Sequence, residues 1–282
     1  MGKRKQTISI LGCGWLGTAL GRKLMSQDFN VKGSTATAES YVQLETTGID
    51  TYHLKVEPEQ VVVDYTHFFN ADVLVICFPP KRNENVTDDF PKQIQQVAQL
   101  IQKVKVQKVI FVSSTSVYES RNKEVREGEE GVPEKQGGKA LLEAEKILSE
   151  LQHVQTSIVR LGGLIGYDRN PARFLSGKKD VPGNVPVNLI HRNDAVNILT
   201  EIIEKDVWGE VFNACSPHHP TKKEFYSKAA EISEIPAPGF VDKTADYKIV
   251  NSDKLMNRLE YSFEYPSPMD YLKEWQEWVY RI

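Results

Sequence analysis

The stretch TISILGCGWLG (Thr7–Gly17) decides the fold of this chain. It joins a β-branched run, typical of a buried strand, to three glycines spaced G-x-G-x-x-G and then to a helical segment. A tight turn at Gly12, close approach of a diphosphate to the backbone at Gly14 and close helix-to-strand packing at Gly17 each require a residue without a side chain. The stretch therefore predicts a nucleotide-binding βαβ unit.

A helix predicted over Trp15–Met25 supports this interpretation. Its first N–H groups, including those of Trp15 and Leu16, and its dipole favour a bound diphosphate. A second strand, predicted over Asn30–Ser34, follows at βαβ distance. A glycine motif alone also occurs in purely structural turns, but this context favours a cofactor, and we predict NAD or NADP.

The composition limits the classes of function. With 282 residues, 40% hydrophobic and 26% charged, the chain can bury one large core, or one core with a smaller lobe. Its net charge of -3 provides no general attraction to nucleic acid or to an anionic membrane surface. A small molecule is the expected partner.

Targeting and metal signals are weak in this sequence. No apolar run reaches the length of a bilayer span, and the first residues lead into a short strand rather than a signal-peptide core, so we expect a cytoplasmic protein. Cys13, Cys77 and Cys215 lack metal-type spacing. We expect buried, reduced thiols and no metal site.

Strand and helix signals alternate along the first two-thirds of the chain. Nearly continuous apolar runs at Val73–Phe78 and Val109–Val112 suit strands of a parallel sheet that is covered on both faces. Apolar residues at helical spacing separate the strands. The pattern predicts an α/β fold with a doubly wound parallel sheet (Rossmann). Further strands are predicted over Asp50–Leu54, Ala71–Cys77, Lys108–Ser113 and Thr156–Leu161.

After Gly162 the pattern becomes rich in glycine, proline and asparagine. Strands are predicted near Val185–Ile190 and Val211–Ala214, and helices over Lys222–Ile232 and Met269–Tyr280. We therefore predict a Rossmann domain of residues 1–165, continued by 185–215. Residues 166–184 and 216–282 are predicted to form a small C-terminal lobe over the sheet's ligand-binding edge.

Three further motifs accompany the glycine stretch: VSSTSVY (112–118), GGKALLEAE (137–145) and NLIHRND (188–194). Together they resemble the extended short-chain dehydrogenase/reductases, and most closely the atypical NAD-dependent epimerase/dehydratase-like members. The similarity extends over nearly the whole chain, including GEVFN (209–213) and YPS (265–267). It implies an oxidoreductase or epimerase that acts on a nucleotide sugar or a similar phosphorylated compound.

The catalytic Tyr-x-x-x-Lys pair that the resemblance implies is missing. No tyrosine here has a lysine four residues later, and alignment of the helix places Gly137 and Leu141 at these two positions. Loss of a positioned proton donor removes about two to four orders of magnitude in rate. Lys139 is the nearest ionisable substitute, although we favour the interpretation that it is a solvated lysine in the first helical turn.

Ser114 matches the family's catalytic serine or threonine, whose hydroxyl contacts a substrate oxygen. Alternatively, Ser113 and Ser114 tie down the strand end through local backbone hydrogen bonds. The resemblance also places Ser113 beside the cofactor. Tyr118 belongs to the same motif, and its alternative role is packing.

The remaining predicted cofactor contacts follow other strands. Ser34 and Thr35 end the second strand, where an acidic residue would favour NAD and an arginine NADP; neither is present, so the choice stays open. Phe78 and Pro79 stand where the family's loop covers the adenosine, or simply stop a strand. Gly162 would admit the nicotinamide ring, or is a loop glycine.

Substrate contacts are expected from loops and from the NLIHRND stretch. Asn188 and His191 lie where the family's substrate cleft meets the core, although a single histidine is more often structural. Arg82, Arg169 and Arg173 are candidates for binding a diphosphate, with Arg173 preferred.

Two hypotheses follow for the function. The first is an NAD(P)-dependent reductase, epimerase or dehydratase with an unrecognised proton donor. The second is a sensor or regulatory protein that binds the dinucleotide without turnover. A monomer and a homodimer are both compatible with the sequence.

Overall fold

The computed structural model describes residues 4–62, 66–81, 83–104 and 106–279. The chain forms two compact units. The first consists of Met1–Val117, Val132–Arg160 and Val196–Phe212, and the second of Tyr118–Gly131, Leu161–Ala195 and Asn213–Ile282.

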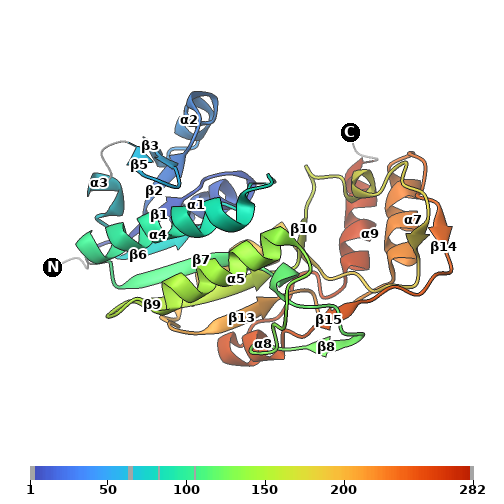
Figure 1. Ribbon diagram of the computed structural model, residues 1–282. Helices are drawn as coiled ribbons and strands as arrows, with labels where there is room; N and C mark the ends of the chain where they lie inside the picture. The colour runs from blue at the N-terminus through green and yellow to red at the C-terminus, as the bar shows by residue number, and fades with distance from the viewer. Residues whose placement is uncertain (1–3, 63–65, 82, 105, 280–282) are drawn as a thin grey trace. The chain divides into compact units, whose positions relative to one another are not determined.

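A seven-stranded sheet forms the core of the first unit (Figure 1). The interior strand β1 pairs in parallel with β2 and with β6, and the pairs β2–β3 and β6–β7 are parallel too. The strand order reverses between β1 and β6, which is where doubly wound sheets bind ligands at the carboxyl ends of their strands. The doubly wound prediction is confirmed. In sheet order the strands are β13 (Val211–Ala214), β9 (Gln155–Leu161), β7 (Lys108–Ser114), β6 (Val73–Ile76), β1 (Thr7–Leu11), β2 (Asn30–Thr35) and β3 (Asp50–His53).

Helices connect these strands. The helical spacing of Ile94, Val97 and Ile101 has the predicted consequence, since all three side chains are completely buried. Helices α4 and α5 pack side by side on one face of the sheet (Figure 1). The helices are α1 (Trp15–Ser26), α2 (Ala38–Glu45), α3 (Thr66–Phe69), α4 (Val86–Val104), α5 (Gln136–Ser149) and α6 (Arg192–Glu204), with a 3-10 turn over Thr115–Val117 and a short hairpin of β4 (Lys55–Val56) and β5 (Val61–Val62).

The second unit contains short parallel strand pairs and two packed helices, α7 and α9 (Figure 1). Its pairs are β10 (Gly163–Ile165) with β12 (Leu189–His191), β11 (Val181–Pro182) with β14 (Phe240–Val241), and β15 (Lys248–Val250) with β8 (Lys123–Val125). Its helices are α7 (Lys222–Ile232), α8 (Asp253–Leu259) and α9 (Pro268–Val279), and a 3-10 turn covers Pro171–Phe174.

Four segments that were predicted in the Rossmann domain group with the second unit: residues 118–131, 161–165, 185–195 and 213–215. Strand β8 pairs with β15, and β10 pairs with β12, so these strands group with the second unit. The strand predicted near Val185–Ile190 is limited to β12. Tyr280, at the end of the last predicted helix, lies outside the described residues.

A buried ion pair fixes α5 against the sheet. The carboxylate of Glu145 on α5 accepts from Arg160 Nε at 3.1 Å and from Nη2 at 2.5 Å, and both side chains are only 4% exposed. The hydroxyl of Ser113 on β7 donates to the same carboxylate at 2.5 Å. One carboxylate on a helix thus joins the strands β7 and β9.

Breaking this network should destabilise the protein strongly. We expect Glu145→Gln to lower the free energy of unfolding by about 3 to 5 kcal/mol, because it removes the carboxylate charge that faces the buried Arg160 guanidinium. The double variant Glu145→Gln/Arg160→Met should be more stable than the single variant in urea-induced unfolding. An unchanged midpoint for Glu145→Gln would contradict the assigned role.

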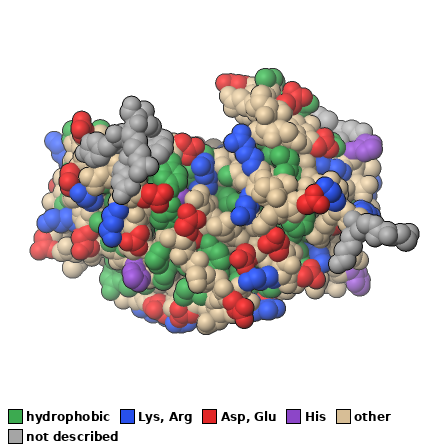
Figure 2. Space-filling view, turned by 180° about the vertical axis from the view of Figure 1, so that it is seen from behind, with side chains coloured by type: hydrophobic (Ala, Val, Ile, Leu, Met, Phe, Trp, Pro, Cys, Tyr) green, Lys and Arg blue, Asp and Glu red, His purple; other side chains and the backbone are tan. Residues whose placement is uncertain are grey.

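Figure 2 shows charged side chains of both signs, interspersed on one face of the molecule. Within the described residues, no helix is both long enough and apolar enough to cross a bilayer.

Candidate functional site

The glycine turn after β1 is held by its own main chain. Gly12 has φ +104°, and a Cβ atom there would lie 2.9 Å from the Cβ atom of Phe78. A Cβ atom at Gly17 would lie 2.5 Å from the carbonyl oxygen of Gly12. Both positions therefore require glycine, one to bring β1 and the segment after β6 together and one to seat α1 on the turn.

Gly14 is different, because a Cβ atom built on it has no neighbour within 4 Å. It is the N-cap residue of α1 and provides no side-chain cap. Amides in the first turn of a helix have no intrahelical acceptor, and they attract anions. Open space in front of an uncapped N-terminus fits a diphosphate held by main-chain amides, with Leu16 and Gly17 among the donors and Trp15 half-buried beside them.

The end of β2 contributes to the turn more directly than predicted. Ser34 is 1% exposed, and its hydroxyl oxygen accepts from the N–H of Gly12 at 3.1 Å. The N–H of Cys13 donates to the carbonyl of Ser34 at 2.7 Å. Thr35 is buried at the strand end, and Thr37 caps α2. With no acidic or arginine side chain at these positions, the choice between NAD and NADP stays open.

The contrast between the glycines gives a test. Gly14→Val should raise the dissociation constant for NADH or NADPH at least tenfold, measured by nucleotide fluorescence, because the new side chain fills the open space. Its melting temperature should stay close to that of the wild type. Gly17→Ala should instead lower the melting temperature. Unchanged nucleotide binding by Gly14→Val would contradict this placement of the diphosphate.

A cavity of about 620 Å³ lies at the carboxyl edge of the same sheet. Gly138 brings α5 to its rim, since a Cβ atom there would lie 2.2 Å from the carbonyl oxygen of Ser116. Gly137 and Leu141, at the positions where the resemblance would place the catalytic pair, both line the cavity, and Gly137 faces open space. Its lining is Pro79, Pro80, Lys81, Asn83, Glu84, Val86, Ser114, Ser116, Lys135, Gln136, Gly137, Gly138 and Leu141.

The predicted catalytic residues occupy three different settings. Ser114 lines the cavity; its oxygen accepts from the N–H of Ser116 at 3.2 Å, which leaves its hydroxyl hydrogen available to a ligand. Lys139 is exposed and does not line the cavity. Tyr118 is completely buried, and its hydroxyl donates to Asn213 Oδ1 at 2.7 Å. We therefore assign Tyr118 a packing role in place of the catalytic role implied by the resemblance.

Two of the predicted cofactor contacts, Ser113 and Gly162, contact other residues of the protein. Two others, Pro79 and Phe78, lie in the segment beside the cavity. The hydroxyl of Ser113 is committed to Glu145. Gly162 is buried, with the Asn188 carbonyl and the Cys215 sulfur at 3.1 and 3.2 Å from a Cβ atom built there. Pro79 lines the cavity, whereas Phe78 packs edge-on against Phe90.

The predicted substrate residues of the second unit are mostly engaged. The side chain of Asn188 donates to the carbonyl of Lys248 at 2.9 Å and accepts from the N–H of Val250 at 2.8 Å, so it fixes β15. Arg173 is exposed, and Arg169 lies over the ring of Phe174. Arg82 lies outside the described residues.

His191 belongs to an aromatic cluster that the sequence did not reveal. It is 1% exposed, and its ring lies 4.2 Å from that of Tyr265, 4.9 Å from that of Tyr271 and 5.2 Å from that of Tyr167. Glu274 accepts hydrogen bonds from Tyr167 and Tyr265. Burial raises the pKa of these tyrosines, to about 12 for Tyr167, so none is an activated phenol.

The same burial should make stability depend on pH through His191. Desolvation, with a smaller effect of Arg192, lowers its pKa from 6.5 to about 4. The unfolded chain then takes up a proton near pH 6.5 and the folded chain only near pH 4, so stability falls as the pH drops through this window. The loss is about 3 kcal/mol. The free energy of unfolding can be measured in urea at pH 7 and at pH 4. Its decrease between these two pH values should be about 3 kcal/mol smaller in His191→Gln than in the wild type. An equal decrease in the two proteins would contradict this role of His191.

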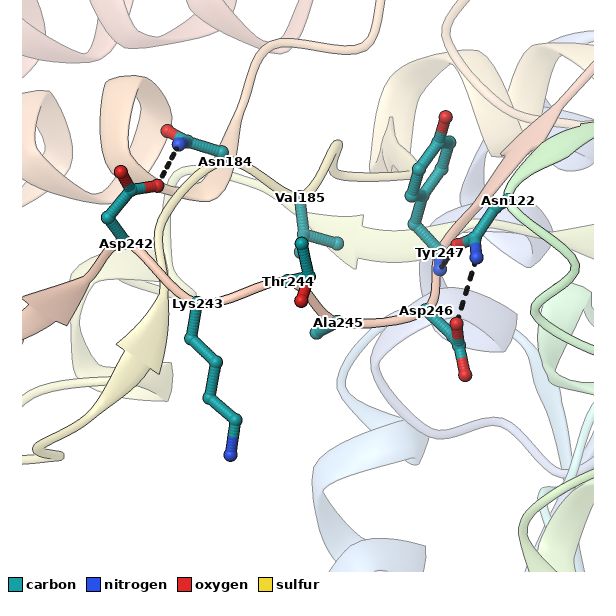
Figure 3. Close-up of a pocket in the computed structure, with 9 residues that line it drawn as sticks. All are labelled: Asn122, Asn184, Val185, Asp242, Lys243, Thr244, Ala245, Asp246 and Tyr247. Carbon is teal, nitrogen blue, oxygen red and sulfur yellow. Dashed lines mark hydrogen bonds between the residues drawn. The ribbon is translucent and has the colours of Figure 1, made fainter.

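A second cavity, of about 360 Å³, lies within the second unit (Figure 3). The amide of Asn184 donates to Asp242, and that of Asn122 donates to Asp246, each at 2.9 Å. Lys243 extends away from these pairs in Figure 3. The cavity is thus a polar groove whose amides are held by neighbouring carboxylates. No motif in the sequence marked it.

Comparison with known proteins places the chain in a family. Residues 7–114 match the family model described as NADP oxidoreductase coenzyme F420-dependent. Protein YeeZ of Escherichia coli (strain K12) is 32% identical over 266 residues, which cover 93% of this chain and 97% of that protein. The chain belongs to the YeeZ family. The YeeZ protein of Escherichia coli O157:H7 matches to the same extent.

Solved structures share the fold of this YeeZ family member. A functionally unknown conserved protein from Silicibacter pomeroyi DSS superposes with a TM-score of 0.78 at 20% identity, covering 97% of this chain and 99% of the other. UDP-glucuronic acid 4-epimerase from Bacillus cereus, solved with UDP-glucuronic acid and NAD, gives 0.79 at 17% identity, covering 98% and 99%. The predicted Rossmann fold is confirmed and is shared with these structures, and the family model supports the predicted NAD(P) cofactor.

Proposed function

We propose that this protein binds NAD or NADP and acts as an oxidoreductase or epimerase on a nucleotide sugar or a similar phosphorylated small molecule. The open space at Gly14, in front of the uncapped start of α1, carries this proposal. The cavity beside Ser114 lies at the same edge of the same sheet, within one compact unit. A dinucleotide bound at the turn would thus have room for a reaction partner nearby.

Different residues of the chain would bind the cofactor and the substrate. Main-chain amides of the glycine turn would hold the diphosphate, and the bound nicotinamide supplies a hydride donor or acceptor. The Ser114 hydroxyl would donate to a substrate oxygen and orient it. Lys139 does not line the cavity, whereas Ser114 does, and this supports Ser114 as the proposed substrate contact.

A dinucleotide-binding sensor without turnover is the second candidate. Gly137 and Leu141 favour it, because neither can exchange a proton at a cavity that both of them line. Titration with NADH and NADPH tests the claim that both candidates share, and absence of binding at millimolar concentrations would contradict both. A panel of nucleotide sugars with cofactor then separates them, because only the enzyme gives turnover.

Restoring the missing pair gives a sharper test. The double variant Gly137→Tyr/Leu141→Lys should raise hydride transfer to an accepted substrate by about two orders of magnitude or more, since it returns a proton donor to the cavity. Leu141→Lys alone is the matched control and should give little increase. A folded double variant that binds NAD(P)H without any gain would show that the cavity does not present substrate to these positions.

A further inference from the structure

The charged residues around the 620 Å³ cavity are unevenly distributed. Lys81 comes from the segment between β6 and α4, and Lys135 from the start of α5. Glu84 is the one carboxylate among the described lining residues. The two lysines thus come from separate segments, and among the described lining residues they outnumber the carboxylate.

Two uncharged features of the lining, the start of α5 and the Ser114 hydroxyl, have the same polarity. Lys135 is the N-cap residue of α5, which has no side-chain cap and no acidic residue in its first turn. The positive end of the helix dipole is therefore uncompensated where Gln136 and Gly137 reach the cavity. The hydroxyl of Ser114, whose oxygen already accepts a hydrogen bond, has only its hydrogen left to offer.

Together these groups form a cavity that offers mainly donors and positive charge. We propose that it binds an anionic group, a carboxylate or a phosphate, on the reacting part of the substrate, with Lys81 and Lys135 as the charged partners and Ser114 as the hydroxyl donor. This inference rests on the proposed function, because it specifies the substrate that the same cavity accepts.

The size of the cavity suits such a ligand. A volume of about 620 Å³ lies within the range of small-molecule sites. Gly137 adds to the space, because nothing lies within 4 Å of a Cβ atom built there. A sugar acid or a sugar phosphate would fit beside Gly137 while its anionic group stays within reach of the two lysines.

Binding of simple probes to the full-length protein tests this proposal. Glucuronate, glucose 6-phosphate and glucose differ mainly in charge, and their dissociation constants can be measured by saturation-transfer NMR. We expect at least one anion to bind tenfold or more tightly than glucose, and the stronger of the two identifies carboxylate or phosphate. Equal binding of glucose, or binding of neither anion at tens of millimolar, would overturn the proposal.

Charge variants locate the effect. Lys135→Met and Lys81→Met should each raise the dissociation constant of the preferred anion at least threefold, without changing that of glucose. Glu84→Gln should lower the dissociation constant of the preferred anion. Lys139→Met is the matched control, because Lys139 lies on the same helix but outside the cavity. An equal effect of Lys139→Met would show a nonspecific field rather than a site.

The cofactor is measured in the same samples. If NAD(P)H binds but anions are not preferred, the proposed function stands and this inference fails. If the lysine-dependent anion preference is present but neither NADH nor NADPH binds, the cavity is an anion site and the proposed function fails.

Discussion

Close main-chain contact at the start of α1 is the constraint on which the rest of the site depends. The helix can begin directly on the turn after β1 because Gly17 has no side chain to meet the carbonyl of Gly12. Gly12 in turn allows the segment after β6 to approach. A Cβ atom at either position would push apart two elements that must meet at the switch point of the sheet. Only Gly14, between them, faces open space.

The second constraint is the placement of α5. The shared carboxylate of Glu145 holds this helix to two strands, and Gly138 lets its first turn touch the carbonyl of Ser116. These contacts are independent of the residues at 137 and 141. The helix therefore keeps its position at the cavity although the acid/base pair that the resemblance implies is absent. The contacts that place α5 thus do not depend on the residues that would carry out proton transfer. For this reason the fold is compatible with both an enzyme and a sensor.

The loss of the catalytic pair also changes the character of the cavity. A glycine and a leucine provide room and an apolar wall, and the polar groups that remain are mostly donors or cations. Such a lining suits recognition of an anion better than proton transfer at neutral pH. This physical contrast links the missing motif to the substrate class inferred for the cavity.

Much of the fold was accessible from the sequence. The glycine spacing, the apolar strand runs and the helical repeats are local patterns, and β1, α1, β13 and α7 match their predicted positions within a residue or two. The motif also singled out Ser114, which lines the cavity.

The roles of individual side chains were decided by tertiary structure. The buried Tyr118 donates a hydrogen bond to Asn213, which lies 95 residues away in the sequence. The ring of His191 contacts tyrosines from two distant segments. Lys135 rather than Lys139 reaches the cavity because of how the first turn of α5 meets the sheet. The sequence by itself determined the elements and the nucleotide turn, since these depend on neighbouring residues. Burial and side-chain direction depend on contacts between distant residues, which leave no local pattern to detect.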